Sequence, residues 1–363
     1  MRFEEFVRRV PKVELHCHFE GSVRASTVAE LASKHSLPLP ATSAATLYDY
    51  ERSDEFFELF AFVASTMCDA GDYARCVYES LEDGVRTSNL RYREMFFNPT
   101  LHTRRGVPIS VVLEGMAAGI AAARADHGVD CRLIADVFRS DAPADALAMV
   151  EDLVEHRHDV LVGLGMDGEE APDPPEKFAA AFALAGAAGL HRTSHASEDA
   201  PPRNIRTCLD VLGCERVDHG YYVLDDPGLV RRCRDEGIGF TTSVTTTVKA
   251  YFSPILTEHP IPRMIDAGLV VSLGSDDPTM VRTDLAQEYL QLSAALGYGP
   301  RAIRQLCLNG VDTAWLGDDD RKSLRRTFLA EIDALEAQLG QASDAGTPRT
   351  PPGPAPPGPG VRP

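Results

Sequence analysis

The sequence predicts an α/β protein folded as a (β/α)₈ barrel, and two observations carry that prediction. Eight short runs rich in apolar and β-branched residues indicate strands, and helical patterns lie between them. From the third run onward the runs begin roughly 25–30 residues apart, which is the length of one βα unit. Eight such units favour a barrel, and a doubly wound open sheet is the alternative fold.

The expected elements follow in chain order. The expected strands are residues 13–17, 90–97, 131–138, 160–166, 191–195, 216–219, 239–243 and 269–275. The helical patterns include residues 81–87, 108–124, 144–156, 175–188, 205–212, 227–236 and 261–267. The interval from about residue 21 to residue 89 is too long for a simple connection, so we expect extra helices there. Five apolar residues recur in that interval with near-helical spacing and are expected to pack in the core: Phe56, Phe57, Leu59, Phe60 and Phe62.

The 363 residues divide into one predicted barrel domain, residues 1–340, and a tail, residues 341–363. The tail is rich in Pro and Gly and contains almost no large apolar residue. Such a segment cannot offset the entropy of ordering, so we expect the tail to be disordered.

The charge balance limits the partners. Lys and Arg total 36 and Asp and Glu total 54, which gives a net charge of −18. Binding to nucleic acid or to an anionic membrane surface needs a basic face, so neither partner is expected. No stretch approaches the ~18–20 apolar residues of a membrane span, and the first residues lack the apolar run of a secretory signal. We therefore expect a cytoplasmic protein with reduced cysteines and a small-molecule substrate, and its oligomeric state stays open.

Histidines and acids gather at the ends of four expected strands. His16 and His18 alternate with Cys17 at the end of the first strand, so both imidazoles face the same side, which in a barrel is the lumen. Three further strand ends carry His195 with Glu198, His219, and Asp276 with Asp277. The carboxyl ends of barrel strands meet at one mouth. Three His and one Asp suit Zn²⁺ or Fe²⁺, which leaves one Glu and one His for proton transfer.

Four motifs resemble the signatures of the adenosine/adenine deaminase family. They are P-K-V-E-L-H-C-H at residues 11–18 with E-G-S at 20–22, H-A-S-E at 195–198, D-H-G at 218–220, and S-D-D-P at 275–278. The motifs occur in the family's order, and the resemblance spans about residues 8–335. The family consists of metal-dependent (β/α)₈ barrels of the amidohydrolase group, which agrees with the fold expected from the strand pattern.

The resemblance also implies a role for each site residue. It implies that one Zn²⁺ per chain, with Fe²⁺ as the other option, is held by His16, His18, His195 and Asp276. It makes His219 the group that orients and deprotonates the attacking water, and Glu198 the acid that protonates the ring nitrogen beside the reacting carbon. The substrate-binding residues that it implies are Glu20, Gly168 and Asp277.

The implied activity is hydrolytic deamination of a 6-aminopurine to the 6-oxopurine and ammonia. The alternatives are another metal-dependent hydrolase on the same scaffold and an inactive purine-binding relative. Adenosine deaminases typically have Asp two residues after the second His of the first motif, whereas this chain has Glu20, as in the adenine deaminase branch. Several stretches also lean to that branch: F-F-N-P at 96–99, H-T-R-R-G-V at 102–107, L-G-M-D at 164–167, P-P-E-K-F at 174–178 and V-D-H-G at 217–220.

Two stretches depart from the family pattern. Ser197 stands where the family usually has Gly, and T-S-V-T-T at residues 242–246 stands where the seventh strand typically ends in C-P-x-S-N. Both lie at the expected mouth, where hydroxyls in the 197 and 242–247 regions can either narrow the pocket or hydrogen-bond a polar group of the substrate. Plain adenosine is therefore not expected to be the best substrate.

Overall fold

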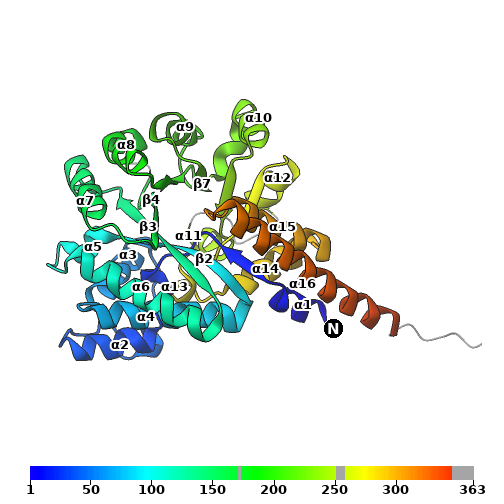
Figure 1. Cartoon of the computed structure of the whole chain (residues 1–363), viewed down its shortest axis with the longest axis horizontal. Helices are drawn as coiled ribbons and strands as arrows, with labels where there is room; N and C mark the ends of the chain where they lie inside the picture. Colours follow the sequence, from blue (N-terminus) through cyan, green and yellow to red (C-terminus); the bar gives the residue numbers. More distant parts are fainter. Residues whose placement is uncertain (171–172, 251–257, 346–363) are drawn as a thin grey trace, which may run out of the picture.

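The computed structural model describes residues 1–170, 173–250 and 258–345, and it shows a barrel of parallel strands surrounded by helices (Figure 1). The strands are β1 (Lys12–Glu14), β2 (Leu90–Phe97), β3 (Asp130–Phe138), β4 (Leu161–Asp167), β5 (His191–Arg192), β6 (His195–Ala196), β7 (Arg216–His219), β8 (Gly239–Thr242) and β9 (Val270–Leu273). They pair in parallel in the orders β1-β2-β3-β4-β5 and β6-β7-β8-β9.

Backbone hydrogen bonds join the two sheets into one closed barrel. On one side, the amide of Thr193 donates to the carbonyl of Leu164 at 3.0 Å, and the amide of Asp218 donates to the carbonyl of Ser194 at 2.9 Å. The short strands β5 and β6 thus make up the single strand expected at residues 191–195. On the other side, the chain after β1 pairs with the chain after β9 through a parallel bridge between Cys17 and Asp276. The eight-stranded barrel is confirmed.

Helices follow the strands and cover the outside of the barrel. In the described part of the chain they are α1 (Phe3–Arg9), α2 (Ala25–Lys34), α3 (Ser53–Ser65), α4 (Ala70–Ser88), α5 (Pro99–Thr103), α6 (Ile109–His127), α7 (Pro143–Glu155), α8 (Ala179–Ala187), α9 (Arg203–Thr207), α10 (Pro227–Glu236), α11 (Thr245–Ala250), α12 (Pro260–Asp266), α13 (Pro278–Val281), α14 (Leu285–Leu296), α15 (Pro300–Thr313) and α16 (Asp318–Ala345). Shorter helical turns are η1 (Glu20–Ser22), η2 (Ala44–Thr46), η3 (Pro175–Phe178), η4 (Cys208–Leu212) and η5 (Tyr221–Asp225).

Helix α4 shows how the sequence sets the ends of a helix. The Asp69 carboxylate accepts a hydrogen bond from the amide of Asp72, which satisfies a backbone donor that the first turn leaves free. The helix ends where Asn89 adopts a left-handed conformation, with φ of 52°. Several other helices begin with Pro, whose fixed φ suits the first turn.

The extra helices expected between the first and second strands are present as α2, α3 and α4. The structure differs from the expected tail at residues 341–345, because α16 extends to Ala345. The rest of the predicted tail, residues 346–363, lies outside the described residues, so its disorder stays a prediction.

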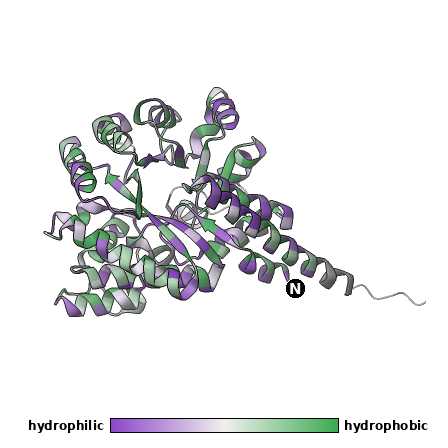
Figure 2. Cartoon of the chain, viewed as in Figure 1, coloured by the Kyte–Doolittle hydropathy of each residue, from purple (hydrophilic) through white to green (hydrophobic). Residues whose placement is uncertain are grey.

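The core lies between the strands and the inner faces of the helices. Apolar stretches alternate with polar ones along the helices in Figure 2, as expected for helices with one face against the barrel. Strand β2 is buried at almost every position, which is typical of a parallel strand covered on both faces. No helix in the described residues has the length and apolar character needed to cross a bilayer.

A buried ion pair lies near the beginning of β7. The Arg216 guanidinium donates to Glu94 Oε2 at 2.6 Å and lies 4.0 Å from the centre of the Trp315 ring. The other oxygen of Glu94 accepts from the backbone amide of Trp315 at 2.6 Å and from the Tyr92 hydroxyl at 3.1 Å. Both charged side chains are at most 2% exposed. The pair therefore links β2 and β7 to the segment that follows α15.

Glu94→Ala is expected to destabilise the protein by about 3–5 kcal/mol, because it leaves the Arg216 charge buried without its partner. Equilibrium urea unfolding measures this loss. The matched variant Glu94→Leu/Arg216→Met removes both charges and should be closer to wild type. Equal stability of Glu94→Ala and wild type would contradict the prediction.

Candidate active site

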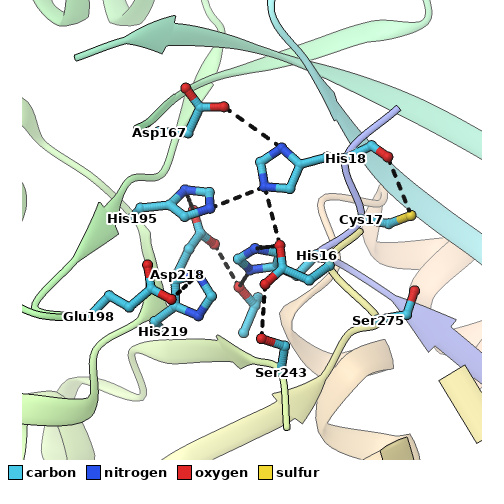
Figure 3. A network of polar contacts seen from close by, with 12 residues as sticks. His16, Cys17, His18, Asp167, His195, Glu198, Asp218, His219, Ser243 and Ser275 are labelled. Atoms are coloured by element: carbon cyan, nitrogen blue, oxygen red, sulfur yellow. Dashed lines mark hydrogen bonds and ion pairs between the residues drawn. The ribbon is translucent and has the colours of Figure 1, made fainter. Parts of the chain in front are cut away.

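The chemistry-bearing side chains meet at the carboxyl ends of the strands. Nε2 of His18 lies 3.2 Å from Nε2 of His195 and 3.4 Å from Oδ1 of Asp276. Nε2 of His16 lies 3.3 Å from the same carboxylate oxygen. Figure 3 shows the rings of His16, His18 and His195 directed toward one region between separate strand ends. Three imidazole nitrogens and one carboxylate oxygen therefore converge.

Hydrogen bonds behind two of these rings fix the positions of their protons. Nδ1 of His16 lies 2.9 Å from Thr241 Oγ1, and this hydroxyl donates to Asp218 Oδ1 at 2.6 Å. The hydroxyl proton is thus committed to Asp218, so the Nδ1–H of His16 is the donor to Thr241. The Nδ1–H of His195 donates to the carbonyl of Met166 at 3.0 Å. Nε2 of His195 therefore presents a lone pair to the shared region. Burial lowers the pKa of His16, but the adjacent Asp276 carboxylate outweighs it and raises this pKa above its ordinary value, so Nε2 of His16 offers its lone pair once a cation displaces its proton.

Burial controls the charges in this region. Burial lowers the pKa of His18 to about 4 and the pKa of His195 well below its ordinary value, so both rings are neutral at neutral pH. Burial alone would raise the pKa of Asp276, but the adjacent His16 outweighs it and holds that pKa well below its usual range. The site thus combines two neutral imidazoles, His18 and His195, with the charge-paired His16 and Asp276.

This donor set fits a divalent transition metal. Nε2 of His16 is buried and has no hydrogen-bond partner in the described structure. Nδ1 of His18 faces a carboxylate oxygen of Asp167 at 3.7 Å, which favours a proton on Nδ1 and a lone pair on Nε2. The lone pairs of His18 and His195 then face each other at 3.2 Å, an arrangement that a cation between them would stabilise. Nitrogen and carboxylate ligands of this kind suit Zn²⁺ or Fe²⁺.

Other groups of side chains that share residues with this ligand set offer different ligand combinations. His219 lies with His16, His195 and Asp276 in a set whose ligand atoms are all within 4.8 Å of one another. A second set contains His18, Asp136 and Asp167, and all three residues are buried.

Glu198 lies beside the metal-binding candidates. Its Oε1 is 3.6 Å from Nε2 of His219, and its side chain is 14% exposed. Burial raises the pKa of Glu198 well above its ordinary value, and the charges of Asp276 and Glu170 raise it further. Burial also lowers the pKa of His219 well below its ordinary value, and its Nδ1 lies 3.2 Å from the Tyr221 hydroxyl. The pair therefore consists of a protonated carboxylic acid and a neutral imidazole.

Three residues at these strand ends have left-handed backbones. Their φ angles are 56° for Ser197, 63° for His219 and 63° for Asp276. Such values are uncommon for residues other than Gly, and strain of this kind concentrates at functional sites. The Ser197 hydroxyl donates to the carbonyl of Pro201 at 2.8 Å, and Ser197 does not line the cavity. Ser197 is thus turned away from the cavity, whereas Thr246 of the other departing stretch lines it.

Asp277 is buried next to Asp276, and its Oδ1 has no hydrogen-bond partner in the described structure. A Cβ atom at Gly21 would lie 1.9 Å from this oxygen, so only glycine leaves room for the carboxylate. Burial and the charge of Asp276 raise the pKa of Asp277 well above its ordinary value.

The structure separates the remaining two substrate-binding candidates. Gly168, with φ of 88°, lines the cavity directly after β4. Glu20 does not line it: its Oε1 accepts from Nε2 of His102 at 3.0 Å and from the amide of Asn98 at 3.1 Å. Glu20 lies in the wall behind Asp167, whose Oδ1 accepts from the Asn98 side chain at 2.9 Å.

A cavity opens onto these residues, and aromatic side chains cover its mouth. Phe56, Phe57 and Phe60 of α3 line it together with Tyr50 and Phe138. The expected core role is confirmed for Phe60, and Phe56 packs against the core, but these two residues and Phe57 also line the cavity. Helical spacing cannot distinguish a face buried in the core from one that covers a ligand cavity. Aromatic side chains thus line one part of the cavity, and histidines and carboxylates line the other.

Several residues that sequence reasoning missed hold the site in place. Asp218 and Thr241 orient His16, and the Ser243 hydroxyl donates to Asp276 Oδ2 at 2.9 Å. Ser243 belongs to the stretch that departs from the family pattern, so its hydroxyl serves the carboxylate rather than the cavity. The Glu170 carboxylate binds the backbone next to Glu198. The sequence could have indicated a role for Asp218, because it directly precedes His219 in a strand. Nothing in the sequence around Glu170 indicates its role.

Comparisons with known proteins agree with this geometry. The family model described as adenosine deaminase matches residues 11–331. An adenine deaminase of Cupriavidus necator is 35% identical over 332 residues, which cover 91% of this chain and 93% of that protein. A zinc-bound amidohydrolase from Burkholderia ambifaria is 32% identical, with a TM-score of 0.88 over 93% of this chain and 94% of that one. An adenine deaminase from Arthrobacter aurescens is 28% identical, with a TM-score of 0.84 over 89% of this chain and 98% of that one.

The family match covers nearly the whole barrel, and the site residues lie on the strand ends that the motifs predict. The chain therefore belongs to the adenosine deaminase family, in its adenine deaminase-like branch.

Proposed function

We propose that this protein is a metal-dependent hydrolytic deaminase that converts adenine to the 6-oxopurine and ammonia. One observation supports the reaction above all others. A buried acid with a raised pKa, Glu198, lies beside a neutral imidazole, His219, and next to a set of metal-ligand side chains. Hydrolysis of a cyclic amidine needs all three, because water must lose a proton while the ring gains one.

In this proposal His16, His18, His195 and Asp276 hold one Zn²⁺, and Fe²⁺ is the other metal that their chemistry suits. A bound metal of this type lowers the pKa of a coordinated water from about 15.7 toward ~7. Thr241 and the Met166 carbonyl hold a proton on Nδ1 of His16 and of His195, so Nε2 is the atom that each ring offers to the metal. The Ser243 hydroxyl restrains the second oxygen of Asp276. These bonds organise the ligands before the metal arrives.

His219 and Glu198 move the protons. Nε2 of His219 accepts the proton of the attacking water. The lowered pKa keeps this ring neutral, and the Tyr221 hydroxyl lies 3.2 Å from its Nδ1, so Nε2 carries the free lone pair. Glu198 donates its proton to the ring nitrogen beside the carbon that carries the amine, which makes this carbon electrophilic. The protonated His219 then passes its proton to the amine as the C–N bond breaks, the hydroxyl on the same carbon returns a proton to Glu198 as the C=O bond forms, and ammonia leaves. The high pKa of Glu198 is what keeps this proton available at neutral pH.

The purine is held by its edges and by its faces. Asp277, with its unpartnered Oδ1, binds one edge, and the amide of Gly168 meets the opposite edge. The phenylalanines of α3 cover the flat ring. Glu20 shapes this pocket from behind the wall by holding Asn98 and His102.

The charges around the cavity favour an uncharged base over a nucleotide. Among the described residues that line the cavity, only Arg52 carries a guanidinium or ammonium group. Its Nε donates to Asp54 Oδ1 at 2.8 Å, so this cation is already paired. Asp276, whose pKa is lowered, and Glu51 also line the cavity, and a negatively charged carboxylate would repel a phosphate. The raised pKa values of Asp167, Glu198 and Asp277 favour their uncharged forms, which suit an uncharged ligand. Relatives from Cupriavidus necator and Arthrobacter aurescens are adenine deaminases.

Removal of the metal with a chelator is expected to abolish ammonia release, and one equivalent of Zn²⁺ should restore it. Elemental analysis together with the activity of the reconstituted protein measures both effects. The reason is that the four ligand side chains cannot lower the pKa of water by themselves, whereas a bound metal can. Full activity in protein shown to be metal-free would contradict the proposal.

Glu198→Gln is expected to keep the metal and the fold and to lower kcat by at least ~10²–10⁴-fold, because an amide cannot deliver the proton. Steady-state kinetics on variant protein of confirmed metal content provides the measurement. The exposed Glu169→Gln offers a control of the same chemistry outside the cavity. A kcat near that of wild type would remove Glu198 from this role.

Adenine is expected to exceed adenosine in kcat/KM by at least ~10-fold, because the phenylalanines that line the cavity suit a flat ring better than a sugar with hydroxyls. Ammonia release from adenine, adenosine, deoxyadenosine, N6-substituted adenines and adenosine monophosphate provides the comparison. If adenosine gave the highest kcat/KM, the assignment of the free base would be wrong.

A further inference from the structure

The acid Glu198 lies on a loop whose backbone is held by a second, buried carboxylate. Glu170 follows β4 and is 4% exposed. Its Oε1 accepts from the amide of Ser197 at 2.6 Å, and its Oε2 accepts from the amide of Glu198 at 3.0 Å. The side-chain amide of Asn204 donates to the same Oε1 at 2.8 Å. One carboxylate thus binds two successive backbone amides and the helix α9 that follows.

The backbone that Glu170 binds has an unfavourable conformation. Ser197 has φ of 56°, which an L-residue with a side chain adopts less readily than glycine does. Hydrogen bonds from amides to a buried carboxylate are stronger than bonds between neutral groups. The Ser197 hydroxyl adds a bond to the Pro201 carbonyl at 2.8 Å. These contacts hold the loop in a shape that its own sequence does not prefer.

The shape of this loop determines where the acid points. Glu198 is the next residue, and its Oε1 lies 3.6 Å from Nε2 of His219. A change in φ at Ser197 would swing the following side chain relative to His195, which precedes it on β6. Displacement of a reacting group by about 1 Å can cost ~10²-fold in rate.

We propose that Glu170 is a positioning residue for the proton-donating acid: by holding the left-handed backbone at Ser197, it fixes the Glu198 carboxyl at the reacting ring nitrogen. The inference rests on the proposed role of Glu198 in deamination. It assigns to Glu170 no contact with the substrate, and Glu170 does not line the cavity.

Glu170 also contributes to the electrostatic environment of the acid. Burial raises the pKa of Glu198 most, the charges of Asp276, Glu170 and Asp199 raise it further, and Arg139 lowers it. The neutral His219 is the remaining titratable neighbour in direct contact with it. Loss of the Glu170 charge is therefore expected to lower the pKa of Glu198, so that Glu198 loses its proton at a lower pH.

The first test compares Glu170→Gln with Glu169→Gln. Both changes remove one carboxylate charge from the same loop, but Glu169 is exposed and Glu170 is buried. A glutamine cannot accept bonds from both amides and from Asn204, because one of its two terminal atoms is a donor. Glu170→Gln is expected to lower kcat by ~10²-fold or more, with little change in KM. In Glu170→Gln the fall of kcat at alkaline pH should also begin at a lower pH. Glu169→Gln should match wild type in both measurements.

The second test repeats the Glu170→Gln substitution with Ser197→Gly present. Glycine adopts a left-handed backbone without help, so the factor by which Glu170→Gln lowers kcat should be about fivefold to tenfold smaller in this background. Equal factors in the two backgrounds would overturn the idea that Glu170 acts through the backbone of Ser197. A kcat for Glu170→Gln equal to that of Glu169→Gln would overturn the proposal as a whole.

Circular dichroism, thermal midpoint and metal content establish that each variant is folded and loaded. If Glu170→Gln does not fold, Asn204→Ala provides the test, since it removes one anchor of the carboxylate and keeps the charge. Asn204→Ala should then lower kcat by a smaller factor without moving the alkaline limb, and an unchanged kcat would overturn the proposal. Failure of the deaminase assignment would look different, because wild type would then release no ammonia from any aminopurine.

Discussion

The convergence of three imidazoles and one carboxylate in a buried barrel mouth is the constraint on which the rest of the site depends. Asp276 carries a charge that burial makes costly, and the adjacent His16 offsets this cost until a metal takes its place. Asp218 with Thr241, and the Met166 carbonyl, fix the protons of His16 and His195 on the far side of each ring. The outer hydrogen bonds thus decide what the inner groups can bind. The Ser243 hydroxyl on Asp276 completes this arrangement.

The same mouth separates two carboxylic acids by environment. Asp276 stays charged because His16 adjoins it, whereas Glu198 retains its proton because burial and the nearby charges of Asp276 and Glu170 favour the neutral form. Environments that push the pKa values of neighbouring acids apart assign one to electrostatic binding and the other to proton donation. The left-handed backbones at Ser197, His219 and Asp276 are the conformational cost of bringing these groups together.

Much of this could be predicted from sequence, for identifiable reasons. Strands β2 and β7 match their expected bounds. The first strand was expected at residues 13–17, but β1 ends at Glu14, so His16 and His18 lie just beyond it. The expected strand at residues 191–195 is interrupted between β5 and β6. The aromatic cover of α3 and the support from Glu170 could not be predicted, because each depends on contacts between segments that are distant in sequence.

The most direct test of the account is the anomalous scattering of a crystal of the Zn²⁺-loaded protein at the zinc edge. The account predicts one peak per chain, about 2.0–2.2 Å from Nε2 of His16, His18 and His195 and from a carboxylate oxygen of Asp276. A peak bound by His219 in place of His18, or one held among the buried set that pairs His18 with two other acids, would contradict it.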